Sequence, residues 1–147
     1  MINSINEFLP KLDNLTVETK PLWGKMTARH MVEHLILAVR ISNGKIKLKC
    51  FSPPEKLPIL KKILLSSRPL PRNFINPVID ENLMPIQYES LEEAKKILAA
   101  EIADYYKYFE DNKAAFLTNV TFGDLNKEEW EIFHQKHFTH HLLQFGI

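Results

Sequence analysis

Six histidines are the side chains of this sequence best suited to metal chemistry, and they fall into two short stretches. His30 and His34 lie in one stretch, and the other four lie within residues 134–141. Residues four apart on a helix project from nearly the same side, so His137 and His141 would present two imidazoles one turn apart. Two imidazoles at that spacing can hold one divalent metal ion. A third ligand must come from another helix, and His34 is the natural candidate.

The remaining histidines leave alternatives open. His30 is four residues from His34, so spacing alone allows a site with four histidines, although its place near the start of its helix favours the open end of the fold. His134 and His140 each lie about 60° to one side of His137 around a helix, which favours a hydrogen-bonded or solvent-facing role. A third interpretation is that the helices only pack together and the histidines fill polar gaps between them.

Hydrophobic periodicity and capping residues predict the helices that hold these side chains. A short helix is predicted over residues 4–15, which Pro10 would bend or confine to a few turns. Longer helices are predicted at about 28–42 after the cap Thr27, at about 90–112 from a capping box that starts at Ser90, and at about 126–144.

Residues 45–89 are predicted to form a long proline-rich crossover between the second and third of these helices. Seven of the nine prolines fall there, which excludes a long uninterrupted helix. Within it, PEKLPILKKILL predicts a short amphipathic helix, whose lysines indicate a solvated face rather than contact with a membrane surface. The segment TNVTFGDL predicts a turn. Together these elements predict one all-α domain over residues 1–147, a four-helix bundle whose sites are built from facing helices.

The composition limits the classes of function. A chain of 147 residues with 45% hydrophobic and 25% charged side chains is long enough for one globular domain, and only four glycines disfavour a turn-rich β fold. A net charge of +1 argues against nucleic acid as a partner. Since no apolar run approaches the length of a membrane span, we expect a soluble cytoplasmic protein. Cys50 is the only cysteine, so it is interpreted as a small apolar filler.

Two segments of the chain resemble the signature regions of the DinB-like, or YfiT-like, superfamily. They are LWGKMTARHMVEHL and FGDLNKEEWEIFHQKHFTHHLLQFG, and the most similar branch consists of uncharacterised domains with WGKM and KHxxHHLxQFG motifs. The resemblance implies a four-helix bundle with a metal site formed by His34, His137 and His141. That branch commonly has glutamine in place of His30 and histidine in place of Asn119, so no pocket role is transferred to these two positions.

Three neutral imidazoles leave coordination positions for water or substrate, as in catalytic metal sites. The resemblance implies a metal-dependent hydrolase, or a transferase that conjugates a low-molecular-weight thiol to a small-molecule substrate. The alternative is a non-catalytic, stress-related module that binds a metal or a small ligand. Imidazole ligands suit zinc, nickel and iron, and zinc or nickel is preferred. A homodimer would fit such a bundle, but no surface patch in the sequence identifies one.

A general base is not identifiable from the sequence. Glu33 adjoins His34, but consecutive helical residues diverge by about 100°, which favours a surface carboxylate. Asp104, Tyr105 and Tyr108 are further candidates to line the pocket, although aromatic residues at this spacing usually belong to a core.

Overall fold

The computed structural model describes residues 3–72, 74 and 83–147, and it is mainly helical with one small sheet. The part of the predicted crossover at residues 73 and 75–82 lies outside the described residues. In chain order the elements are η1 (Ile5–Asn14), α1 (Ala28–Ser42), η2 (Pro54–Lys56), α2 (Leu57–Leu65), α3 (Leu91–Asp111), β1 (Leu117–Asn119), β2 (Gly123–Leu125) and α4 (Lys127–Gln144).

Capping side chains begin the long helices where the sequence predicts. The Thr27 side chain accepts a hydrogen bond from the His30 backbone N–H at the start of α1. Asn126 and Glu129 form a complete capping box at the start of α4. The first helix differs from the prediction in kind, because η1 is a 3₁₀-helix that contains Pro10. A proline inside a helix removes a backbone donor, which is consistent with this short, tighter element.

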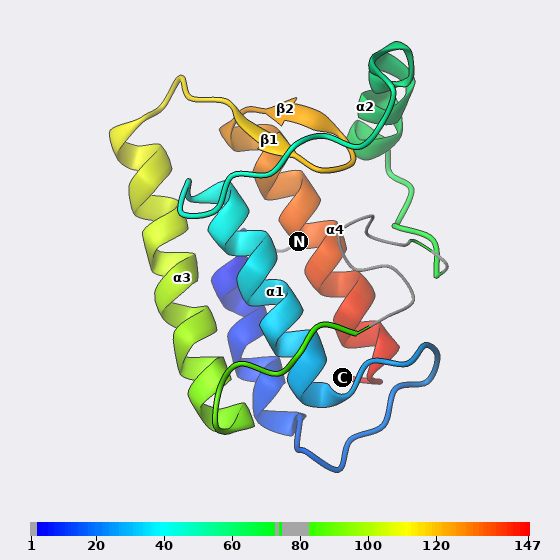
Figure 1. The fold of residues 1–147 in the computed structure, drawn as a ribbon, viewed down its shortest axis with the longest axis vertical. Coiled ribbons are helices and arrows are strands. Elements are labelled where there is room, and N and C mark those ends of the chain that lie inside the picture. The colour runs from blue at the N-terminus through cyan, green and yellow to red at the C-terminus, as the bar shows by residue number, and fades with distance from the viewer. Residues whose placement is uncertain (1–2, 73, 75–82) are drawn as a thin grey trace.

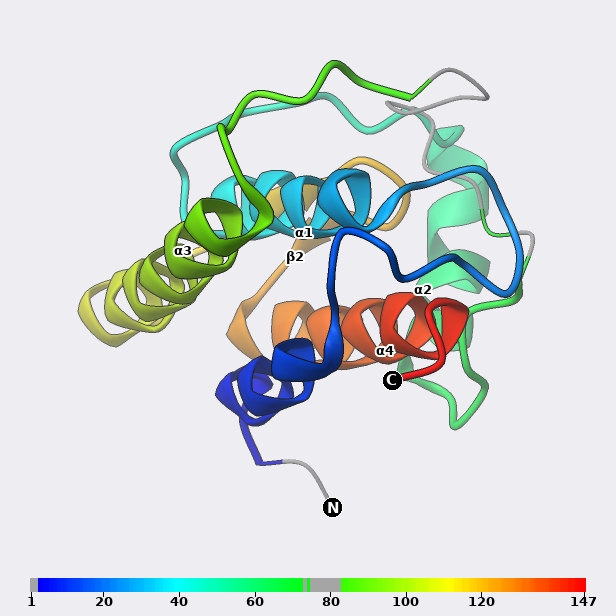
Figure 2. The same ribbon diagram turned by 90° about the horizontal axis from the view of Figure 1, so that it is seen from below.

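The long helices run side by side and enclose one core. Figure 1 shows α1 between α3 and α4, and in the turned view of Figure 2 η1 lies beside α4 on the side away from α1. Helix α1 packs along α3, while η1 contacts both α3 and α4. The helices η1, α1, α3 and α4 all contribute to the same hydrophobic cluster, for example Phe8 from η1, Leu35 from α1 and Phe138 from α4. The two helices that carry all six histidines therefore face one another across part of this core.

A short β-hairpin crosses one end of the helices (Figure 1) and was missed by the all-α prediction. Strands β1 and β2 pair antiparallel, with Leu117 opposite Leu125. The predicted turn, residues 118–125, covers most of this hairpin, and only residues 120–122 lie between the strands. The side-chain oxygen of buried Asn119 accepts hydrogen bonds from the backbone N–H groups of Thr121 and Phe122. Three-residue strands are too short for an alternating hydrophobic pattern, so the sequence shows only the turn.

Helix α2 is the predicted amphipathic helix, and it packs on α4 through buried Leu64. Its opposite face leaves Ile59 65% exposed. On α4, the Lys136 ammonium group donates to the backbone carbonyls of Leu64 and Ser66, which anchors the C-terminal end of α2. Across residues 3–72, 74 and 83–147, a bilayer could not be spanned by any helix, since none is both sufficiently long and sufficiently apolar.

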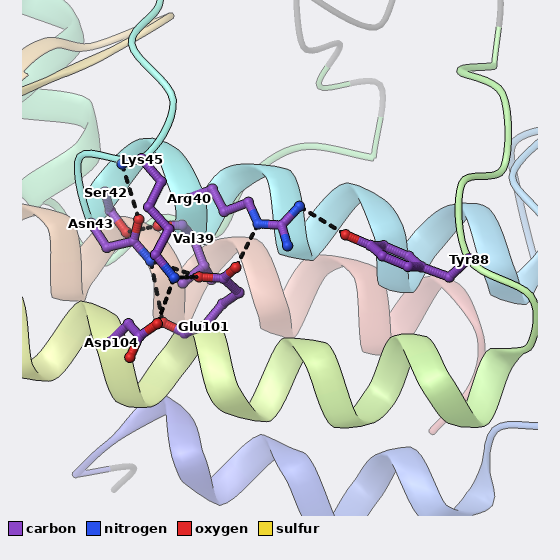
Figure 3. A network of polar contacts seen from close by, with 8 residues as sticks. All are labelled: Val39, Arg40, Ser42, Asn43, Lys45, Tyr88, Glu101 and Asp104. Atoms are coloured by element: carbon purple, nitrogen blue, oxygen red, sulfur yellow. Dashed lines mark hydrogen bonds and ion pairs between the residues drawn. The ribbon is translucent and has the colours of Figure 1, made fainter.

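A buried carboxylate joins α1 to α3 (Figure 3). The Glu101 side chain is 6% exposed and accepts hydrogen bonds from Lys45 at 2.6 Å, from Asn43 at 3.1 Å and from Arg40. Burial alone would raise the pKa of Glu101, but these hydrogen bonds outweigh burial and hold that pKa below its ordinary value. Arg40 continues the network to the hydroxyl of Tyr88, just before α3 begins.

Replacing this carboxylate by an amide, Glu101→Gln, is expected to lower the free energy of unfolding by about 1–3 kcal/mol, because Arg40 and Lys45 lose a nearly buried charge partner. Asp104→Asn is the matched control. Asp104 also pairs with Lys45, but its side chain is 55% exposed, so we expect a loss below about 1 kcal/mol. Urea denaturation of both variants measures the difference, and equal losses would contradict this account of the network.

Candidate metal centre

His34 reaches the centre of the fold from α1. Met31 and Leu35 on either side of it are fully buried, which fixes the rotation of the helix and turns His34 toward α4. The His34 side chain is therefore 5% exposed even though it borders the core. Its ring lies edge-on to the rings of both His137 and His141.

His137 and His141 reach the same point from α4. They are one helical turn apart, and they are 1% and 6% exposed. Most residues of α4 that face the other elements are large and buried, including Trp130, Phe133 and Phe138. This packing leaves the two histidines little freedom to turn elsewhere, and the His137 ring lies against Phe133.

The three imidazoles converge through their Nε2 atoms. The His34 Nε2 lies 2.8 Å from the His137 Nε2, which lies 3.1 Å from the His141 Nε2. Among the residues that the structure describes, these three form the one group of histidine, cysteine or acidic side chains whose ligand atoms are close enough to share a metal ion, all within 4.8 Å. The structure thus brings together the three residues that spacing nominated.

All three imidazoles are held in the neutral form. Burial, together with a smaller effect of the nearby His140, lowers the pKa of His34 to about 4. Burial also lowers the pKa values of His137 and His141 well below their ordinary value, with neighbouring histidines acting in the same direction. A neutral imidazole carries a lone pair on one nitrogen, which is the form that binds a metal ion.

The other three histidines have different roles. The His30 Nδ1 lies 2.6 Å from the Thr27 hydroxyl oxygen at the first turn of α1, and His30 lines a cavity that also reaches His34. His134 is fully buried, and its Nε2 lies 2.7 Å from the Ser42 hydroxyl oxygen. Of the two roles expected for His134, the structure therefore shows the hydrogen-bonded one. Burial lowers the pKa of His134 to about 3. His140 is 8% exposed and lies edge-on to Trp23, so a solvent-facing role does not apply to it either.

The side chains considered as a general base or as pocket lining make other contacts, although Glu33 also lines a cavity that reaches His34. The Glu33 carboxylate accepts hydrogen bonds from the backbone N–H groups of Gln87 and Tyr88, so it is a half-buried anchor for this segment instead of a surface carboxylate. Asp104 pairs with Lys45. Tyr105 is buried against His134 in the core.

His34 lines two of the cavities formed by the described residues. The larger, about 80 Å³, lies between α1 and residues 83–88, and Arg40 and Glu33 contribute its charged groups. Its apolar lining includes Met26, Ile36, Leu37, Ile46, Leu83, Met84 and Pro85. The smaller cavity, about 10 Å³, lies where α1 and α4 meet the hairpin, and Asn119 lines it together with His34. Leu37 lines both cavities, so they adjoin along one side of α1.

Residues 72–146 match a family described as a protein of unknown function, DUF1569. This is just over half of the 147 residues. The chain belongs to the DUF1569 family. No curated protein and no solved structure matches it significantly. The DUF1569 region contains the hairpin, α3 and α4, so it includes His137 and His141, whereas His34 lies outside it.

One polar residue of this candidate site was missed by sequence reasoning. The side-chain oxygen of Gln144 lies 2.8 Å from the His141 Nδ1, and Gln144 is 6% exposed. Its position three residues after His141 on a helix was the available signal, because residues three apart are neighbours on the helix surface.

Proposed function

We propose that this chain is a divalent-metal-dependent enzyme whose ion is held by His34, His137 and His141. The convergence of three buried, neutral imidazoles through their Nε2 atoms carries the proposal. Ligand nitrogens bound 2.0–2.1 Å from one cation are separated by about 2.9–3.4 Å, depending on the coordination angle. The separations of 2.8 Å between His34 and His137 and of 3.1 Å between His137 and His141 fall near this range, and all three ligand atoms lie within 4.8 Å of one another, which supports one shared ion.

The arrangement of the four longer helices supports the same proposal. We interpret η1, α1, α3 and α4 as the four helices of a DinB-like bundle, with the hairpin and α2 as additions to it. The WGKM and QFG segments that carry the resemblance meet in space, since the Gln144 amide donates to the Trp23 carbonyl. On this interpretation the metal is zinc or nickel, with iron as the further candidate.

The chemistry proposed is hydrolysis of a small molecule or transfer of a low-molecular-weight thiol to one. A divalent ion at this site would supply Lewis acidity toward a water molecule or a thiol. The chain itself supplies neutral ligands and a largely apolar cavity that reaches His34. We propose that a substrate with an apolar portion enters along α1, past Leu37.

A non-catalytic metal-binding module is the second candidate, and one observation favours it. The three histidines are only 1–6% exposed, which suits a closed structural site as well as a protected catalytic one. The two candidates differ in whether a small ligand from solution can reach the ion.

Cobalt(II) substitution separates these candidates, because its visible spectrum reports the ligands of the ion. We expect azide or a small thiol to change the spectrum of the cobalt-loaded protein, and the thiol to do so at lower concentration. Chelator-sensitive hydrolysis or thiol transfer in a substrate panel should then be lost in His137→Ala. A cobalt spectrum that neither ligand alters would contradict the enzyme proposal and favour the closed module.

A further inference from the structure

Residues 22–24 are docked onto the last turn of α4 beside the candidate metal centre. The Leu22 backbone N–H donates to the Gln144 backbone carbonyl at 2.6 Å. The Gln144 side-chain Nε2 donates to the Trp23 backbone carbonyl at 3.0 Å. Hydrogen bonds from residues 22–23 therefore hold both the backbone and the side chain of Gln144, while its amide oxygen lies 2.8 Å from the His141 Nδ1.

The Trp23 carbonyl determines which ring nitrogen of His141 carries the proton. A backbone carbonyl can only accept, so the amide end that faces Trp23 must be the NH₂ group. The amide oxygen then faces the His141 Nδ1, and since this oxygen also can only accept, Nδ1 must carry the proton. In a neutral imidazole the lone pair is then left on Nε2, the atom that points at the Nε2 of His137.

Gly24 permits this close approach. Its φ angle is +83°, which side-chain-bearing residues rarely adopt, and a Cβ placed there would lie 2.6 Å from the Gln144 Nε2. A residue with a side chain at position 24 would therefore strain the backbone and also displace the Gln144 amide.

His141 differs from the other two members in this respect. Within the described part of the chain, the Nδ1 atoms of His34 and His137 are buried without a hydrogen-bond partner, whereas the His141 Nδ1 has one. We propose that Gln144, held by Trp23 and Gly24, is a positioning residue that prepares the His141 Nε2 to bind the metal ion. This proposal rests on the proposed function for its consequence, but the protonation of His141 can be tested without any metal.

Nitrogen NMR of the metal-free protein tests the proposal first. Long-range nitrogen–proton spectra distinguish a protonated from an unprotonated ring nitrogen. We expect His141 in the wild-type chain to carry its proton on Nδ1, and Gln144→Met to lose this single form. A wild-type His141 protonated on Nε2, or a Gln144→Met variant with unchanged His141 signals, would overturn the proposal.

Zinc affinity, measured by competition with a chromophoric chelator, provides the second test. Loss of an outer hydrogen-bond partner of a metal-binding histidine typically costs 10–100-fold in affinity, so Gln144→Met should raise the Kd for zinc by about that factor. Gln144→Glu keeps an acceptor for the His141 Nδ1 proton and should remain within about a few-fold of the wild-type Kd. If Gln144 only fills space, Gln144→Met should bind zinc more tightly than Gln144→Glu, because Met is uncharged like Gln and Glu would place a charge in a buried position. Observing that order would overturn the proposal.

Two glycine variants separate the contact from general backbone strain. Gly44 also has a positive φ, +81°, but a Cβ there would meet Tyr108 at an ordinary 3.5 Å, far from Gln144. Gly24→Ala should weaken zinc binding as Gln144→Met does, while Gly44→Ala should leave the Kd unchanged, and equal effects would overturn the role of Gly24. If the wild-type chain binds no zinc while the NMR result is as expected, the proposed function fails and the positioning of His141 by Gln144 stands.

Discussion

The metal-free protein is expected to lose about 5 kcal/mol of its free energy of unfolding between pH 7.5 and pH 5.5. The four most deeply buried histidines contribute most of this loss, and they are His34, His134, His137 and His141. Burial depresses each of their folded-state pKa values, to about 4 for His34 and to about 3 for His134. Burial also lowers the pKa of His140, which acts in the same direction. An unfolded chain would titrate these groups near pH 6.5.

The sign follows from which state binds more protons. Below pH 6.5 these four histidines bind protons in the unfolded chain but not in the folded chain, so acid stabilises the unfolded state. Each histidine then costs about 1.4 kcal/mol at one pH unit below 6.5. The contribution of these neutral histidines to the free energy of unfolding is complete above about pH 7. It is lost as the pH falls toward their depressed folded-state pKa values.

Urea denaturation at several pH values in the presence of a chelator measures this loss. His134→Phe removes one of the four groups and keeps His34, His137 and His141. We therefore expect this variant to lose about a quarter less free energy of unfolding than the wild type between about pH 7.5 and pH 5.5. The comparison uses differences between pH values, so a uniform cost of repacking cancels. A wild-type loss below about 1 kcal/mol would show that the histidines are not held neutral by burial.

Zinc or nickel at 100 times its Kd is expected to stabilise the wild-type fold by about 2.7 kcal/mol, because an ion that binds only the folded state shifts the folding equilibrium. For a domain of this size, that corresponds to a rise in Tm of roughly 5–11 °C. His34, His137 and His141 supply the three Nε2 atoms, so alanine at any of these positions should abolish the rise.

Thermal unfolding with and without the ion provides the measurement, and two variants serve as controls. His30→Ala removes an imidazole at the first turn of α1, and His134→Phe removes a buried one on α4. Both should retain the metal-induced rise in Tm. A rise that persists in His137→Ala, or one that disappears in the controls, would contradict the assignment of the ligands.

The local part of this structure was predictable from the sequence, because caps and helical periodicity act between residues a few positions apart. Thr27 and Asn126 begin their helices as predicted, and the four-residue spacing of His137 and His141 puts both on the same face of α4. His34 could be nominated since it borders the apolar face of α1. The sequence thus identified the triad that the structure brings together.

The missed features depend on contacts between distant parts of the chain. Nothing near Glu33 indicates that its carboxylate binds the backbone of Gln87 and Tyr88, more than fifty residues away. The bond from Gln144 to the Trp23 carbonyl joins the two ends of the chain in the same way. The hairpin was missed because its strands are held by pairing across the turn rather than by a pattern within either strand.

Metal content of tag-free protein, measured by inductively coupled plasma mass spectrometry, tests the central claim most directly, since a purification tag would itself bind metal. The account predicts about one zinc or nickel ion per chain in the wild type and in His30→Ala, and loss of that ion in His34→Ala, His137→Ala and His141→Ala. No bound metal after incubation with zinc, nickel and iron, or full retention of metal in the three triad variants, would contradict it.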